Sequence, residues 1–183
     1  MNKIEEYRKI NDLPSLMEFM NKYIQYGFVD ISNNIHVNEL KGVRKLYKTS
    51  DIPITINSGV GTCIEQTRII RDVLNRFGYE TKLYCILSAS ADKLVSDNDV
   101  RIHSFVLAFK DDKCVYFEHP NYVRRGIHVF DKEDDALEYI HSYYKDKSIY
   151  KLYLIDDVPI GLSFDELISY VKSFDLTYDY RKK

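Results

Sequence analysis

Residues 56–87, INSGVGTCIEQTRIIRDVLNRFGYETKLYCIL, contain the pattern that decides the fold. After a loop with two glycines, apolar residues recur at helical spacing until Gly78, which predicts an amphipathic helix ending there. Short, β-branched and aromatic segments follow, as is typical of strands. Cys63 lies at the boundary between loop and helix, not inside an apolar element, and this position suggests a function for its thiol.

The flanking sequence predicts helices before this stretch and mostly strands after it. Residues 12–27 have the period of a helix, and residues 38–48 indicate a weaker one. The predicted strands are 79–87, 101–109, 113–119, 126–130 and 149–156, and further helices are predicted at about 131–144 and over 162–174. This order favours an α+β fold in which N-terminal helices and the Cys63 helix pack on an antiparallel β-sheet, followed by a C-terminal β-α appendage.

Length and composition predict one globular domain over residues 1–183. The chain is 45% hydrophobic and 30% charged, and it contains no low-complexity stretch. A net charge of −2 gives no electrostatic reason to expect a nucleic-acid partner. The short basic runs at 124–125 and 181–183 are interpreted as solvated surface.

The sequence gives no sign of export or membrane insertion. The N-terminus has no apolar signal region, and no window approaches the roughly 20 apolar residues of a membrane helix. Three cysteines do not suggest a disulfide framework. We therefore expect a cytoplasmic protein with reduced thiols and no membrane partner; its oligomeric state stays open.

A cysteine that begins a helix has a reason to be reactive. The unpaired N–H groups of the first turn and the helix dipole both favour thiolate over thiol. Gly59 and Gly61 allow a tight backbone beside a substrate, and the N–H of Cys63 is suited to bind an oxyanion. Cys63 is therefore a candidate nucleophile.

A nucleophile needs a base, and the base needs an orienting group. His103 opens the apolar run HSFVLAF, where a strand's first residue meets the rim of a sheet. If Asp111 and Asp112 form a two-residue hairpin turn, Lys110 pairs with Lys113 and position 118 lies opposite position 105. Glu118 then shares a face with His103, one diagonal step away and within reach of the imidazole. The alternative is that these three residues are unrelated.

Other candidates are interpreted as structural. Cys85 and Cys114 lie mid-strand among apolar residues, as core thiols do. Cys114, His119 and His128 fit no zinc pattern, so we expect no metal site. The remaining histidines are read as packing or surface residues. Asn57 and Gln66 are weak candidates for oxyanion or substrate contacts, with Tyr47 as an alternative to Asn57; capping is the alternative for Gln66.

The segments GTCIEQTRIIRDVLNRFGYETKLYCIL, IHSFVLAF and CVYFEHPN resemble the transglutaminase-like superfamily, relatives of papain-type cysteine proteases. The resemblance covers a core of about residues 58–122. It implies Cys63 as nucleophile, His103 as general base and acid, and Glu118 as orienting carboxylate. The family usually has Asp at the third position, and many members have Trp two positions after the His, where this chain has Phe105.

The resemblance and the residues together predict a thiol-dependent amide hydrolase or acyl transferase that acts on a peptide or protein without a cofactor. Hydrolysis is favoured because water is the more available acceptor, while transamidation and deamidation stay open. The first alternative is a non-catalytic peptide- or protein-binding module with the same fold, motivated by the Glu and the missing Trp. A second is a regulatory protein with Cys63 as a redox sensor.

Overall fold

The computed structural model describes residues 2–38, 43–90, 100–144 and 148–179. Its helices are α1 (Lys3–Arg8), α2 (Leu13–Tyr23), the 3₁₀ turn η1 (Arg44–Leu46), α3 (Ile52–Ser58), α4 (Cys63–Arg76), α5 (Glu133–Tyr144) and α6 (Phe164–Lys172). Its strands are β1 (Gln25–Val29), β2 (Ile35–Val37), β3 (Val60–Gly61), β4 (Glu80–Ser90), β5 (Arg101–Lys110), β6 (Lys113–Glu118), β7 (Gly126–Phe130), β8 (Ser148–Ile155) and β9 (Leu176–Asp179).

The main sheet has six strands in the order β7-β6-β5-β4-β8-β9, and every neighbouring pair is antiparallel. The predicted α+β class with an antiparallel sheet is therefore confirmed. The predicted C-terminal unit is not an appendage, because β8 pairs with β4 along eight residues in the middle of the sheet.

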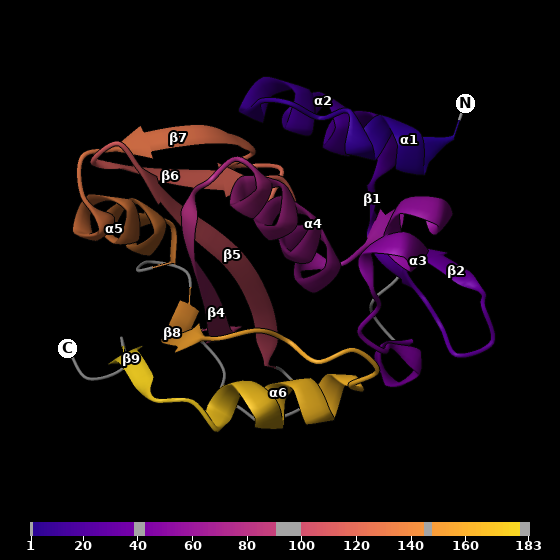
Figure 1. Cartoon of the computed structure of the whole chain (residues 1–183). Coiled ribbons are helices and arrows are strands. Elements are labelled where there is room, and N and C mark those ends of the chain that lie inside the picture. The colour runs from indigo at the N-terminus through magenta and orange to yellow at the C-terminus, as the bar shows by residue number, and fades with distance from the viewer. Residues whose placement is uncertain (1, 39–42, 91–99, 145–147, 180–183) are drawn as a thin grey trace.

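Both faces of the main sheet are buried, each beneath a helix (Figure 1). Along β5, Val106 and Ala108 point into the core on the α4 side, while Phe105 and Leu107 point into the core on the α5 side. This alternation follows from the period of two of a strand. His103 has the same parity as Phe105, and their rings stack with centroids 6.2 Å apart. His103 therefore lies on the α5 side of β5.

A second, three-stranded sheet (β2-β1-β3) lies beside the N-terminal end of α4. β1 pairs with β3 in parallel, with Tyr26 opposite Gly61. The sequence did not predict β1, because residues 12–27 have one continuous helical period. The helix ends instead at Tyr23, and the chain is extended from Ile24 onward.

The predicted weaker helix over 38–48 lies partly outside the described residues, and η1 is the helical turn that the described part contains. The basic run 181–183 lies wholly outside them.

Candidate functional site

A reciprocal cap fixes the start of α4 at Cys63. The Thr62 side chain accepts hydrogen bonds from the first turn, and Glu65 Oε2 accepts the Thr62 N–H at 2.9 Å. Such a capping box satisfies donors that a helix start leaves unpaired. Glu65 is buried, and its other oxygen accepts from the Tyr47 hydroxyl at 2.9 Å. Tyr47, a candidate for the oxyanion contact, is thus placed in the cap.

The Cys63 thiol lies against a part of β5 that is not paired with β6. β6 pairs with β5 from Lys110 only as far as Val106↔Phe117, so in this register the first half of β5 has no β6 partner. The Cys63 Sγ donates to the Ile102 carbonyl oxygen there, at 3.6 Å. The Cys63 side chain is buried, with the residue 2% exposed.

Tyr26 is a neighbour of Cys63 that the sequence did not reveal. The pairing of Tyr26 with Gly61 brings β1 beside the chain that leads into Cys63. Burial, followed by electrostatic interactions with Cys63 and Glu65, raises the pKa of Tyr26 well above its ordinary value. Its hydroxyl therefore stays protonated beside the thiol and is able to donate a hydrogen bond.

The hairpin between β5 and β6 has the predicted register. Asp111 and Asp112 both have positive φ (51° and 57°), as a two-residue type I′ turn requires, and Lys110 pairs with Lys113. This register brings His103 and Glu118 together, with His103 Nε2 2.9 Å from Glu118 Oε2. The side chains are 14% and 1% exposed, so the pair is largely shielded from water.

The two groups stabilise each other's charged forms. Burial alone would lower the pKa of His103, but its interactions with Tyr144, Glu118 and Cys63 outweigh burial and raise that pKa well above 6.5. Burial alone would raise the pKa of Glu118, but His103, Tyr116 and the Asn121 N–H lower it. The arrangement favours an imidazolium–carboxylate pair, with the imidazole also interacting with Cys63.

Glu118 has further partners that the sequence reasoning missed. The Tyr116 hydroxyl donates to Oε2, and the Asn121 N–H donates to Oε1 at 2.9 Å. Arg124 Nη2 lies 3.9 Å from Oε2. Tyr116 could have been found from its spacing, because residues 116 and 118 share a strand face. The prediction of solvated surface at 124–125 was wrong for Arg124, which is 6% exposed.

Gln66 links two parts of the site. Its Nε2 donates to the Gly61 carbonyl at 2.7 Å, and its Oε1 lies 2.6 Å from His119 Nδ1. Because an amide oxygen only accepts, His119 Nδ1 carries the proton. Gln66 thus fixes the backbone before Cys63. Asn57 is exposed on α3, where its carbonyl oxygen accepts from Lys3 Nζ at 3.3 Å, and its described contacts do not reach Cys63.

The other two cysteines differ from Cys63 in their surroundings. Cys85 and Cys114 are buried, free thiols inside β4 and β6, as predicted. Burial raises the pKa of Cys85 well above 9.0 and that of Cys114 to about 11. Both thiols are therefore held in the unreactive protonated form.

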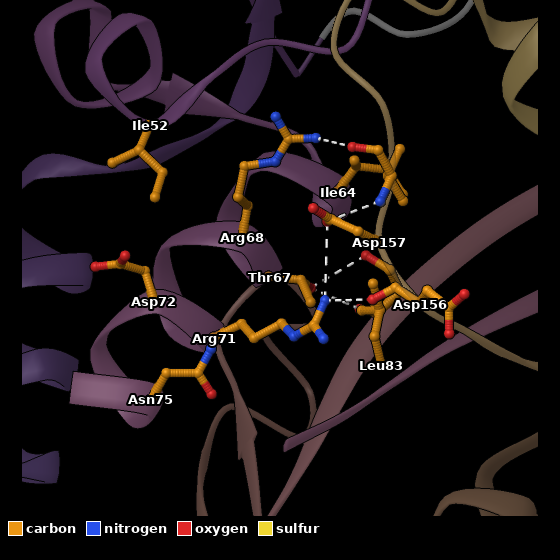
Figure 2. Close-up of a pocket in the computed structure, with 12 residues that line it drawn as sticks. Ile52, Ile64, Thr67, Arg68, Arg71, Asp72, Asn75, Leu83, Asp156 and Asp157 are labelled. Carbon is orange, nitrogen blue, oxygen red and sulfur yellow. Dashed lines mark hydrogen bonds and ion pairs between the residues drawn. The ribbon is translucent and has the colours of Figure 1, made fainter. Parts of the chain in front are cut away.

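A separate cleft of about 340 Å³ lies between α4 and residues 156–158 (Figure 2). Two arginines of α4 line this cleft, and the guanidinium group of each donates hydrogen bonds to backbone carbonyl oxygens. Arg68 donates to Ser50 and Val158, and Arg71 Nη1 donates to the Asp156 carbonyl at 2.5 Å. These contacts tie α4 to the β8–α6 connection and so hold the Cys63 helix on the sheet.

In the described parts of the chain, no helix combines the length and the apolar character needed to cross a membrane. Comparisons of the chain with protein-family models, with curated proteins and with solved structures found no match.

Proposed function

We propose that this chain is a thiol-dependent amide hydrolase or acyl transferase that uses Cys63, His103 and Glu118. The observation that carries the proposal is the buried hydrogen bond of 2.9 Å between His103 and Glu118, beside a cysteine at the first position of a helix. Nucleophile, base and orienting group are the three parts that such chemistry requires. The resemblance of residues 58–122 to the transglutaminase-like superfamily supports the same roles.

The proposed reaction begins with attack of the Cys63 thiolate on an amide carbonyl carbon, which forms a C–S bond. The carbonyl oxygen becomes an oxyanion, and the donors proposed for it are the Cys63 N–H and the Tyr26 hydroxyl. His103 then gives its proton to the amine nitrogen as the C–N bond breaks, leaving a thioester.

Water or a second amine next attacks the thioester, with His103 as the base. The new C–O or C–N bond replaces the C–S bond, and the thiol is regenerated. We propose hydrolysis as the main outcome, because water is the more available acceptor. The tight fit of the Glu118 carboxylate keeps the imidazole oriented through both steps.

A second candidate function is a non-catalytic binding module, and the burial of Cys63 favours it. At 2% exposure, with its thiol bonded to the Ile102 carbonyl, Cys63 meets a substrate only after a local movement. A module that binds peptides without cleaving them needs no such movement.

The test is turnover of fluorogenic peptidyl amides and of glutamine-containing peptides, the latter followed by release of ammonia. Cys63→Ala should abolish turnover, whereas Cys114→Ala, which removes another buried thiol, should retain it. Turnover that persists in Cys63→Ala rules out the proposed role. Binding of these peptides by the wild type without turnover favours the binding module.

A further inference from the structure

Arg124 is a buried cation held mainly by aromatic rings. Its guanidinium carbon lies 4.5 Å from the ring centroid of Tyr143, 5.4 Å from that of Tyr144 and 5.6 Å from that of Tyr116. The residue is 6% exposed. Within the described residues, its three guanidinium nitrogens form no hydrogen bond. Ring faces attract a cation, but they do not replace the hydrogen bonds lost with water.

One carboxylate compensates this charge. Among the described ion pairs, the partner of Arg124 is Glu118, with Nη2 3.9 Å from Oε2. That spacing is longer than a hydrogen bond, so the two groups interact as an ion pair. A buried charge without such a partner is strongly destabilising. Glu118 is therefore the group whose negative charge offsets that of Arg124 in the interior.

The oxygen that faces Arg124 also faces the imidazole. Glu118 Oε2 lies 2.9 Å from His103 Nε2 of β5 and accepts from the Tyr116 hydroxyl of β6. From α5, Tyr144 interacts with both His103 and Tyr116. The Cys63 side chain of α4 also interacts with His103. Tyr139 of α5 also packs on Tyr116, and so does His128 of β7, whose Nε2 bonds to the Arg124 carbonyl at 2.8 Å.

Two cations thus compete for one oxygen. An ionised carboxylate draws a proton onto a neighbouring imidazole, and a second cation beside the carboxylate weakens that pull. We propose that Arg124 is a positioning residue, which keeps Glu118 ionised in the interior and limits how tightly Glu118 holds the proton of His103. The electrostatic role of Arg124 does not depend on the proposed function. Its consequence for catalysis does rest on that function, namely that the imidazolium releases its proton to a leaving amine.

The experiment is an NMR titration of the His103 imidazole in the full chain, in a Cys63→Ala background. Removing the thiol makes the result independent of whether Cys63 is a nucleophile, so the two proposals fail separately. Arg124→Met should move the titration midpoint of His103 to higher pH by about one pH unit, because a nearby cation is lost. Arg124→Lys, which keeps the charge, should leave the midpoint close to that of the parent.

Arg125→Met is the matched control, because Arg125 donates to the His119 carbonyl and to Asn21. It should not move the His103 midpoint. Equal midpoints in Arg124→Met, Arg124→Lys and the parent would overturn the inference and leave Arg124 a packing residue.

If Arg124→Met does not fold, the double variant Glu118→Gln/Arg124→Met tests the inference instead. It leaves neither charge alone in the interior, so we expect it to regain the circular dichroism spectrum and a cooperative urea transition. A double variant that stays unfolded would overturn the inference, because removing both charges would then not restore the fold.

Discussion

Replacing Glu118 with Gln removes one negative charge from the buried cluster and keeps the size of the side chain. Glu118 accepts from the Tyr116 hydroxyl at Oε2 and from the Asn121 N–H at Oε1, and the single amide oxygen of Gln can keep one of these two hydrogen bonds. The charge that faces His103 and Arg124 is lost as well. The variant therefore separates electrostatics and hydrogen bonding from packing.

The expected loss of stability in Glu118→Gln follows from the burial of its partners. Arg124 is 6% exposed, and breaking a buried ion pair by removing one partner costs about 3–5 kcal/mol. The hydrogen bond to a charged imidazole contributes about 1.5–3 kcal/mol. Because both act on one carboxylate, the two effects do not add fully. We expect Glu118→Gln to lower the free energy of unfolding by about 4 kcal/mol, a large part of the roughly 5–15 kcal/mol of a typical domain.

The assay is urea denaturation followed by circular dichroism at pH 7. Asp131→Asn is the control, because it removes a carboxylate from a pair with Lys113 at 2.6 Å whose Asp131 side chain is 78% exposed. The urea midpoint of the control should not change. A loss in Glu118→Gln below about 1 kcal/mol, the size of an exposed pair, would refute the inferred burial of charge at Glu118.

Two further predictions concern the segment around the cysteine. Burial, together with the charge of Arg125, lowers the pKa of His119 to about 4, so between pH 6.5 and 4 the unfolded chain binds a proton that the folded chain does not. The free energy of unfolding should therefore decrease by up to about 3 kcal/mol as the pH is lowered from 6.5 to 4. His119→Gln should make this pH dependence weaker. Gly61→Ala would place a Cβ 2.9 Å from side-chain atoms of both Glu65 and Thr55, costing about 1–3 kcal/mol of stability and displacing Cys63.

Urea titrations at several pH values test the prediction for His119. An unchanged pH slope in His119→Gln would mean that other groups cause the acid sensitivity. Gly126→Ala is the control for the Gly61→Ala prediction, because its nearest contact would be the His128 ring, at 3.2 Å, followed by the Arg124 carbonyl oxygen at 3.9 Å. Equal losses in Gly61→Ala and Gly126→Ala would contradict the inferred tightness of the loop.

Local patterns in the sequence were enough to predict the two elements that carry the site. The 3.6-residue period predicted the helix at 63–76, and the Asp111–Asp112 turn predicted the β5–β6 register. That register places Glu118 beside His103, because strand alternation fixes which side chains share a face. Both features depend on residues close together in the chain.

Contacts between distant segments were not predictable in this way. Tyr26 lies near Cys63 through a parallel pairing of β1 with β3, and nothing within residues 25–29 specifies that partner. The burial of Arg124 depends on α5, which brings Tyr143 and Tyr144 over its guanidinium. A short basic run looks the same in a sequence whether tyrosines or water cover it.

The most direct test of the account is the rate at which iodoacetamide alkylates Cys63 as a function of pH, in the wild type and in His103→Ala. Peptide mapping makes Cys85 and Cys114 internal references. We predict that Cys63 reacts faster than both well below pH 8, and that His103→Ala abolishes this reactivity, as expected for a thiolate–imidazolium pair. A Cys63 rate that rises only near pH 8.5, the ordinary value for a thiol, and that is unchanged in His103→Ala would contradict the account.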